Sequence, residues 1–259
     1  GEFETDIRVT SDLAGITIDA PEPIGKKTAD SRLISVELME DTQQRPLFHL
    51  NYDDVVKAVW QTGDATRAEI TIGLPEPELP ATGIRFKARL NDLSISDWTQ
   101  WQQKWLKDLP ETENNDNWPA VEIELAVDNL QFNQWVLNDV QSKAFQRNQI
   151  WQLEIQSRQM RGNIRWPMDS ALLPTLHFDF VDLQLPAASN ETSDRKKFSS
   201  DLWPSFQLNI DNLTVDGMQL GRVQARAIQQ GQRWVLESAS LQSAVLQANL
   251  DGVWQKNEL

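Results

Sequence analysis

Hydrophobic and polar residues alternate with a period of two along most of the chain. The clearest alternating segments are residues 69–72, 121–127, 206–210, 222–227 and 246–250. Because successive side chains of a β-strand point to opposite faces, this pattern predicts strands that have one apolar and one polar face. Such strands are typical of antiparallel sheets, whereas parallel strands covered on both faces are apolar throughout. The sequence therefore predicts a nearly all-β protein built on a long antiparallel sheet.

The second half of the chain contains an internal repeat. The triplet Asp128-Asn129-Leu130 recurs as Asp211-Asn212-Leu213, an offset of 83 residues, and Trp151 recurs as Trp234 at the same offset. Several apolar positions between these markers repeat in the same way, which indicates a duplicated structural unit. Each copy is predicted to be a four-strand meander. Shorter echoes of the triplet occur at Asn91-Asp92-Leu93 and Val181-Asp182-Leu183.

One segment has helical spacing. Trp98, Trp101, Trp105 and Leu109 fall on one face of a helix expected near residues 96–109, with Ser96 as the N-cap and Pro110 as the stop. A tryptophan stripe of this kind usually packs a helix on a sheet. Two alternatives stay open, a plug at one end of a groove and a contact with a membrane surface.

These patterns divide the chain into segments. Residues 1–3 are expected to be a cloning scar, and residues 4–110 form a first β portion that includes the helix. A β repeat unit follows over residues 111–186. Residues 187–201 are a polar linker, and residues 202–259 form the second β repeat unit.

Composition narrows the classes of function. Of the 259 residues, 40% are hydrophobic and 24% charged, which is typical of a folded domain. A formal net charge of −14 makes a nucleic-acid partner unfavourable, because phosphate binding requires a basic surface. The absence of cysteine excludes disulfides and thiolate metal sites. No run of 18 apolar residues is present that would predict a membrane-spanning helix.

The sequence contains no motif that predicts catalysis. His49 and His177 lie far apart, each between apolar neighbours in a strand pattern, and a single strand histidine is more often structural than catalytic. Glu122 and Glu124 share one strand face without an apolar pocket that would raise the pKa of one of them. We therefore expect a protein that is not an enzyme and has no metal site and no cofactor.

The predicted strands pose a physical problem, because about fifteen amphipathic strands must cover an apolar face. They can pack as a sandwich, close into a barrel, or curl around an apolar ligand, and composition does not choose among these. At about 4.8 Å per strand, fifteen strands make a ribbon of roughly 70 Å, which is long for a sandwich and suits an open trough.

Several motifs resemble the YhdP-type family of AsmA-like envelope proteins. The matching passages, in order, are Ser11-Asp12-Leu13-Ala14-Gly15, Ala20-Pro21-Glu22-Pro23-Ile24-Gly25-Lys26, Leu79-Pro80-Ala81-Thr82-Gly83-Ile84, Leu93 to Asp97-Trp98, Leu202-Trp203-Pro204, Asp211-Asn212-Leu213, Gly217, Leu220-Gly221 and Val253-Trp254. They extend from about Asp6 to Trp254 and are turn and strand-end residues whose order is specific. The match is weaker over residues 131–190.

The resemblance implies a function and a location. It implies a strongly curved sheet that forms an open, taco-like hydrophobic groove in the periplasm of a Gram-negative bacterium. The full-length protein would be anchored in the inner membrane by a segment outside this chain, with outer-membrane or envelope proteins as further partners. Phospholipids would move along the groove toward the outer membrane and maintain its lipid balance and barrier.

The groove would hold phospholipid acyl chains. The residues expected to line it are the apolar members of the alternating segments: Ile70, Ile72, Ile123, Leu125, Val127, Phe206, Leu208, Ile210, Val223, Ala225, Leu246 and Leu250. The sequence shows no headgroup contact, so selectivity among phospholipids is expected to be weak. The competing hypotheses are a structural or adhesive β-protein with a closed core and, for a chain with 11 tryptophans, a carbohydrate-binding β-module.

Overall fold

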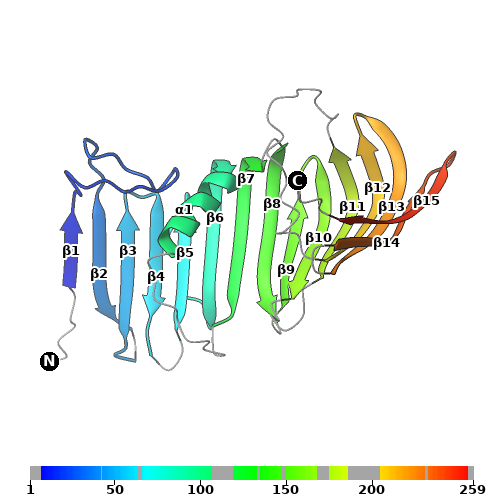
Figure 1. Ribbon diagram of the computed structural model, residues 1–259. Coiled ribbons are helices and arrows are strands. Elements are labelled where there is room, and N and C mark those ends of the chain that lie inside the picture. The colour runs from blue at the N-terminus through cyan, green and yellow to red at the C-terminus, as the bar shows by residue number, and fades with distance from the viewer. Residues whose placement is uncertain are drawn as a thin grey trace. The chain divides into compact units, whose positions relative to one another are not determined.

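The computed structural model describes residues 7–41, 43–63, 66–106, 119–132, 135–147, 150–167, 175–185, 205–230 and 233–255. Over this part of the chain it contains one α-helix and a 15-stranded sheet whose strand order follows the sequence from β1 to β15 (Figure 1). The prediction of a nearly all-β protein with one helix is confirmed. The chain divides into two compact units, residues 1–145 and 146–259, and the boundary falls within β8.

The first unit contains eight strands and the helix α1. Their bounds are β1 (Ile7–Ser11), β2 (Ile34–Glu40), β3 (Pro46–Tyr52), β4 (Val56–Gln61), β5 (Arg67–Ile72), β6 (Gly83–Ser94), α1 (Ile95–Leu106), β7 (Val121–Phe132) and β8 (Trp135–Arg147). Neighbouring strands pair antiparallel except β5 with β6 and β6 with β7, which pair parallel. Parallel neighbours require a crossover, and these crossovers lie over residues 73–82 and over the segment that begins with α1.

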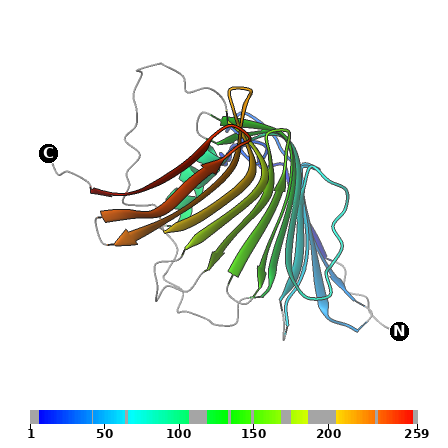
Figure 2. The ribbon, with the colours of Figure 1, turned by 90° about the vertical axis from the view of Figure 1, so that its right-hand side faces the viewer.

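The second unit contains the remaining strands, which lie side by side in Figure 2. Their bounds are β9 (Ile150–Gln156), β10 (Met160–Pro167), β11 (Leu176–Leu185), β12 (Phe206–Val215), β13 (Met218–Gln230), β14 (Arg233–Gln242) and β15 (Gln247–Gln255). Strands β12 to β15 form the predicted antiparallel meander. Strand β11 pairs parallel with β12. The predicted linker, residues 187–201, lies outside the described residues.

The repeat is visible in the strand boundaries. Strand β8 begins at Trp135 and β13 at Met218, while β9 begins at Ile150 and β14 at Arg233. Both pairs of strand starts are separated by the offset that the sequence motifs show. The tryptophan that repeats also occupies equivalent places, because Trp151 and Trp234 are each the second residue of their strands.

Two predictions about the sheet are wrong. Three strand pairs are parallel, so the sheet is mostly but not wholly antiparallel. The sheet is also neither closed nor strongly curled, whereas a strongly curved sheet was expected. The alternating pattern shows which face of each strand is apolar but contains no information about how far the sheet bends. Bending depends on features such as β-bulges, which the pattern does not reveal. Register shifts occur in four pairs of the second unit, and the described pairs of the first unit keep a constant register.

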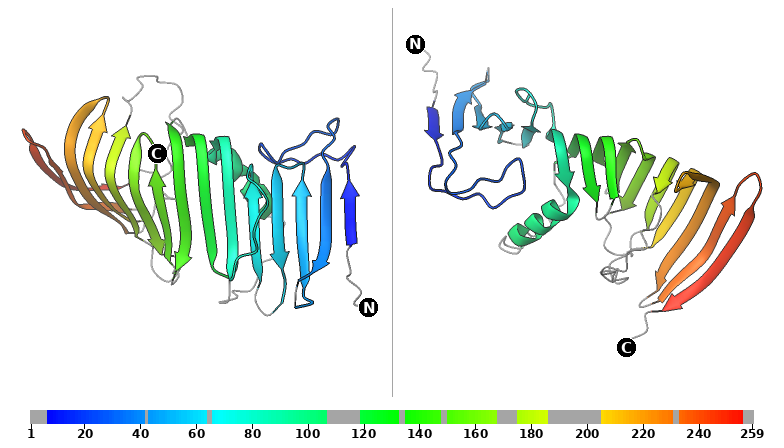
Figure 3. Two further views of the ribbon diagram at one scale, coloured as in Figure 1. Left: turned by 180° about the vertical axis from the view of Figure 1, so that it is seen from behind. Right: turned by 90° about the horizontal axis from the view of Figure 1, so that it is seen from above.

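Helix α1 begins earlier than predicted. The hydroxyl of Ser94, not of Ser96, accepts a hydrogen bond from the backbone N–H of Asp97 (3.3 Å) and caps the helix. The helix packs against β7, as a helix docked on the sheet would. In Figure 3 it lies on the same side of the first unit as the dark blue loop between β1 and β2. The side chain of Trp105 and residue Leu109 are outside the described residues.

Candidate functional site

The first unit presents one continuous apolar face. Residues that pair across neighbouring strands point to the same side of a sheet, so a row of register partners defines a face. One row contains Val36, Leu50, Ala58, Ile70, Phe86, Ile123 and Ala144. The next contains Ile34, Tyr52, Val56, Ile72, Ala88, Leu125 and Ser142. Leu90, Val127 and Val140 form a shorter row beside these.

Burial in β5 is the reverse of that in a strand of an ordinary globular protein, whereas Tyr52, Val127 and Val140 of the apolar rows are buried. In β5 the polar residues Glu69 and Thr71 are buried, at 2% and 3% exposure, whereas Ile70 and Ile72 on the apolar face are only half-buried. Phe86 remains 37% exposed. Side chains that are usually core residues therefore keep apolar surface in contact with solvent.

Among the described elements no second sheet covers this face, although α1 and the loop between β1 and β2 lie on part of it. Apart from α1, which packs on β7, the described elements pack closely only against their neighbours in the sheet. A sandwich would show contacts between strands of two facing sheets, about 10 Å apart. Within the described part of the chain, no facing sheet therefore packs on the apolar face to form a sandwich core.

The opposite face of the first unit is a network of ion pairs. The Glu69 carboxylate lies 3.0 Å from Arg85 Nη1 and 3.1 Å from Lys87 Nζ, and Arg85 Nε lies 3.4 Å from Glu122. Lys143 pairs with Glu122 and, at 3.0 Å, with Glu124. The hydrogen bond from Lys143 is the main cause that lowers the pKa of Glu122. The carboxylate of Glu122 is therefore stabilised as an anion and is not prepared to act as an acid.

The second unit also has an apolar face, built from its own register rows. Phe178, Leu208, Ala225, Ala239 and Leu250 form one row. Phe180, Ile210, Val223, Leu241 and Ala248 form another. Its other face carries a polar ladder in which Asp179 accepts a hydrogen bond from Asn209 (2.7 Å) and pairs with Arg165 (2.9 Å).

The residues predicted to line a groove are distributed over these two faces. Ile70, Ile72, Ile123, Leu125 and Val127 lie on the apolar face of the first unit. Phe206, Leu208, Ile210, Val223, Ala225 and Leu250 lie on that of the second. Leu246 differs, because it belongs to the turn before β15, where its N–H donates to Ser243 Oγ (3.0 Å), and it is 52% exposed.

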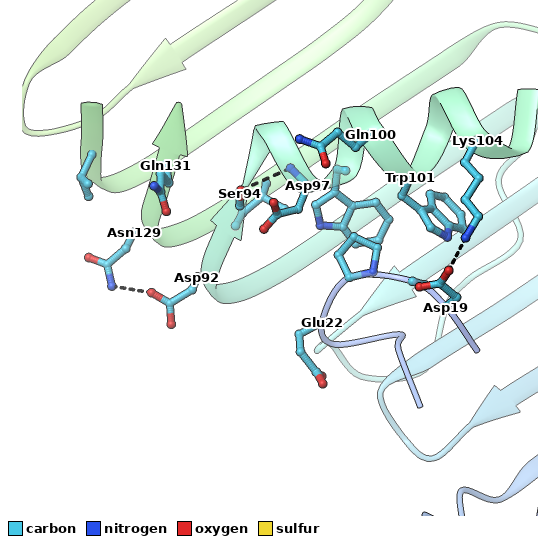
Figure 4. Close-up of a pocket in the computed structure, with 15 residues that line it drawn as sticks. Asp19, Glu22, Asp92, Ser94, Asp97, Gln100, Trp101, Lys104, Asn129 and Gln131 are labelled. Atoms are coloured by element: carbon cyan, nitrogen blue, oxygen red, sulfur yellow. Dashed lines mark hydrogen bonds and ion pairs between the residues drawn. The ribbon is translucent and has the colours of Figure 1, made fainter. Parts of the chain in front are cut away.

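A pocket that the sequence did not predict lies beside α1 in the first unit (Figure 4). Its walls come from the loop at Asp19–Glu22, from α1, and from the ends of β6 and β7. Asn129 donates a hydrogen bond to Asp92 (3.0 Å) on one side, and Lys104 pairs with Asp19 on the other. The only sequence signal was the repeated triplet, because Asp92 and Asn129 belong to it and pair in register.

The structure adds no evidence for chemistry at the histidines. His49 and His177 lie in β3 and β11, where their register partners include Glu37 and Arg165. Among the described residues, no three His, Cys, Asp or Glu side chains are grouped as metal ligands would be. No helix in the described part of the chain has the length and apolar character needed to span a membrane.

The fold defines a class of protein, a single-layer β-sheet in which each unit has one polar face and one apolar face, and no second sheet of described strands packs on the apolar faces. The chain belongs to the YhdP family, whose model matches residues 1–258 under the description YhdP protein. No curated protein and no solved structure matches the chain.

Proposed function

We propose that this chain is a segment of a bridge-like protein that conducts phospholipids between the inner and outer membranes of a Gram-negative bacterium. The observation that carries the proposal is the uncovered apolar face, whose half-buried aliphatic side chains form rows across consecutive strands. Phospholipid acyl chains are the occupants that such rows fit. The family to which the chain belongs supports the same function.

The energetics of the face suit transport. Burial of a methylene group contributes about 0.8 kcal/mol, so an acyl chain laid along the rows gains on the order of 5 to 10 kcal/mol. The lining side chains of β5, β6 and β7 are all apolar and none is charged, so no position along a row binds an acyl chain through a specific polar contact. A lipid can then move along the face without a deep free-energy minimum.

The alternatives are less well supported by the described elements. A structural or adhesive protein with a closed core requires a second layer, and packing between elements shows single-layer contacts. A carbohydrate-binding module requires exposed tryptophan platforms. Trp234 is instead 4% exposed and packs on Phe206 with ring centroids 6.1 Å apart. We place the proposed protein in the periplasm, anchored in the inner membrane through a segment outside this chain.

A charge placed on the apolar face tests the proposal. Leu125→Asp puts a carboxylate in the middle of the face, where a bound acyl chain would have to desolvate it at a cost of several kcal/mol. We expect the purified variant to retain less phospholipid, measured by mass spectrometry of extracted lipid, with an unchanged melting temperature. A half-exposed site allows the new carboxylate to stay hydrated, so the fold survives.

Ala126→Asp is the matched control, because Ala126 is the next residue of β7 and its register partner on the polar face is Arg89. This variant should bind as much lipid as the original protein. Gross unfolding of Leu125→Asp would indicate a closed core. A folded Leu125→Asp variant with unchanged lipid content would remove Leu125 from the lipid path.

A further inference from the structure

The pocket beside α1 has the size and position of a headgroup site. Its volume is about 890 Å³, and it opens between α1, the loop at Asp19–Glu22 and the ends of β6 and β7. Tyr52, a member of an apolar row, donates a hydrogen bond through its hydroxyl to the backbone carbonyl of Ile24 (2.9 Å). The loop and the pocket therefore lie on the apolar side of the first unit, as Figure 3 also shows for the loop and α1.

The pocket continues the apolar face. On the apolar face, the last apolar pair of β6 and β7 is Leu90 with Val127, and the next pair on that face is Asp92 with Asn129, which lines the pocket. Two residues of a strand span about 7 Å. An amphiphile whose tails lie on the apolar rows can thus place its polar end in the pocket without bending away from the sheet.

The pocket wall contains an aromatic pair. Trp98 and Trp101 of α1 both line it, with ring centroids 5.5 Å apart and ring planes at 75°. Indole faces attract cations through the negative potential of the ring. Because the two ring planes are at a large angle, the faces of the two rings can contact an ammonium group from different directions.

The charges of the pocket favour a cation over an anion. Among the described residues that line it, Asp19, Glu22, Asp92 and Asp97 are acidic and Lys104 is basic. Lys104 pairs with Asp19, and Arg32, outside the lining, lies 3.7 Å from Glu22. Asp92 accepts its hydrogen bond from a neutral amide. Negative charge remains on the helix that carries the tryptophans, because Asp97 precedes Trp101 by about one turn of α1 (Figure 4).

We infer that this pocket binds the ammonium headgroup of a zwitterionic phospholipid whose acyl chains lie on the apolar face. The inference rests on the proposed function and adds a headgroup preference to it, which the sequence did not predict. The carboxylates of Asp92 and Asp97 compensate the ammonium charge, and Trp98 and Trp101 contact it through their ring faces. Lys104 pairs with Asp19 and neutralises that carboxylate.

Short-chain lipids test this inference on the whole chain. The probes are dihexanoyl phosphatidylethanolamine, dihexanoyl phosphatidylglycerol and free phosphoethanolamine, each titrated below its micelle concentration and followed by calorimetry. A partly exposed ammonium site should favour the ethanolamine lipid by about tenfold. The Asp92→Asn/Asp97→Asn double variant should lose that preference, to within about twofold, and keep its affinity for phosphatidylglycerol.

The Asp128→Asn/Asp139→Asn double variant is the control, because it removes the same charge from residues that do not line the pocket. It should keep the tenfold preference. Equal binding of the two lipids by the unmodified protein would overturn the headgroup site and leave the proposed function standing, whereas binding of neither lipid would end both. Phosphoethanolamine that binds as tightly as the lipid would identify a site for the free headgroup compound and overturn the lipid assignment.

Discussion

Replacement of Glu69 by glutamine tests how the polar face of the first unit holds the crossover between β5 and β6. The carboxylate is 2% exposed and accepts hydrogen bonds from Arg85 (3.0 Å), Lys87 (3.2 Å) and the backbone N–H of Glu78 (3.2 Å). Glu78 belongs to the crossover segment, so Glu69 joins this segment to β6. Glutamine has nearly the same shape but lacks the charge, and its NH2 group cannot accept a hydrogen bond, so only one side-chain oxygen remains as an acceptor.

The magnitude follows from these three contacts. A hydrogen bond to a charged group contributes about 1.5 to 3 kcal/mol, but the released cations can be rehydrated. Arg85 and Lys87 are 33% and 30% exposed, and Arg85 keeps Glu122 at 3.4 Å. We therefore expect Glu69→Gln to lower the free energy of unfolding by about 3 kcal/mol, well below the sum of the contacts. For a unit of this size that corresponds to a loss of roughly 10 °C in melting temperature.

The effect should depend on pH in a defined direction. Burial alone would raise the pKa of Glu69, but the hydrogen bonds from Glu78, Lys87 and Arg85 outweigh it and lower the pKa from its ordinary value of 4.5. A carboxyl whose folded-state pKa is depressed stabilises the fold above its unfolded-state pKa and loses that contribution as the pH falls. The difference between the original protein and Glu69→Gln should thus be full at pH 7 and shrink below about pH 4.5.

Thermal melts followed by circular dichroism from pH 7 to pH 3 measure both quantities. Glu124→Gln is the matched control, because this glutamate also pairs with a lysine on the polar face but its side chain is 42% exposed. Glu124→Gln should lower the free energy of unfolding by at most about 1 kcal/mol. A Glu69→Gln variant as stable as the control at pH 7, or a stability difference that grows toward pH 3, would refute the role assigned to Glu69.

Two further predictions concern local structure in the first unit and in β15. Ser94→Ala removes the cap of α1 and should cost about 1 kcal/mol, seen as faster hydrogen exchange at the start of the helix, whereas Ser96→Ala should leave exchange there unchanged. Gly83→Ala should lower stability by about 2 to 3 kcal/mol in a denaturant titration, because Gly83 has a φ of +75° and an added Cβ would lie 2.4 Å from the Ala120 carbonyl oxygen. Gly252→Ala meets no atom within 4 Å and should change stability by less than about 0.5 kcal/mol.

Sequence reasoning recovered the faces of the strands better than the connections between them. The alternation at residues 69–72 and 121–127 placed Ile70 and Ile123 on one face, and the register confirms it through Phe86. Strand direction was not recoverable from the alternation, because alternation is the same in parallel and antiparallel neighbours. The pocket beside α1 was missed for a related reason, since the approach of residues 19–22 to the helix depends on a loop whose path no periodic pattern specifies.

The repeated triplets contained the information on strand direction. They were interpreted as strand ends, but in the structure they pair with one another. Asp92 and Leu93 lie opposite Asn129 and Leu130, and Asp182 and Leu183 lie opposite Asn212 and Leu213. A motif that recurs in the same order on adjacent strands can align residue by residue only if the strands are parallel. Asn129 and Asn212 then donate hydrogen bonds to Asp92 and Asp182 at 3.0 and 3.1 Å, and these hydrogen bonds stabilise that alignment.

The error about strand direction left the functional hypothesis intact for a geometric reason. Register partners share a face whether two strands run parallel or antiparallel, because the pleats of paired strands coincide. A row such as Ile70, Phe86 and Ile123 therefore passes through two parallel pairs, and the row continues to Ala144 through an antiparallel one. Crossovers alter the connection at the strand ends while the apolar rows stay continuous. A lipid would contact the apolar face of the sheet. The period-two pattern is sufficient to identify the residues on that face, whatever the direction of the strands.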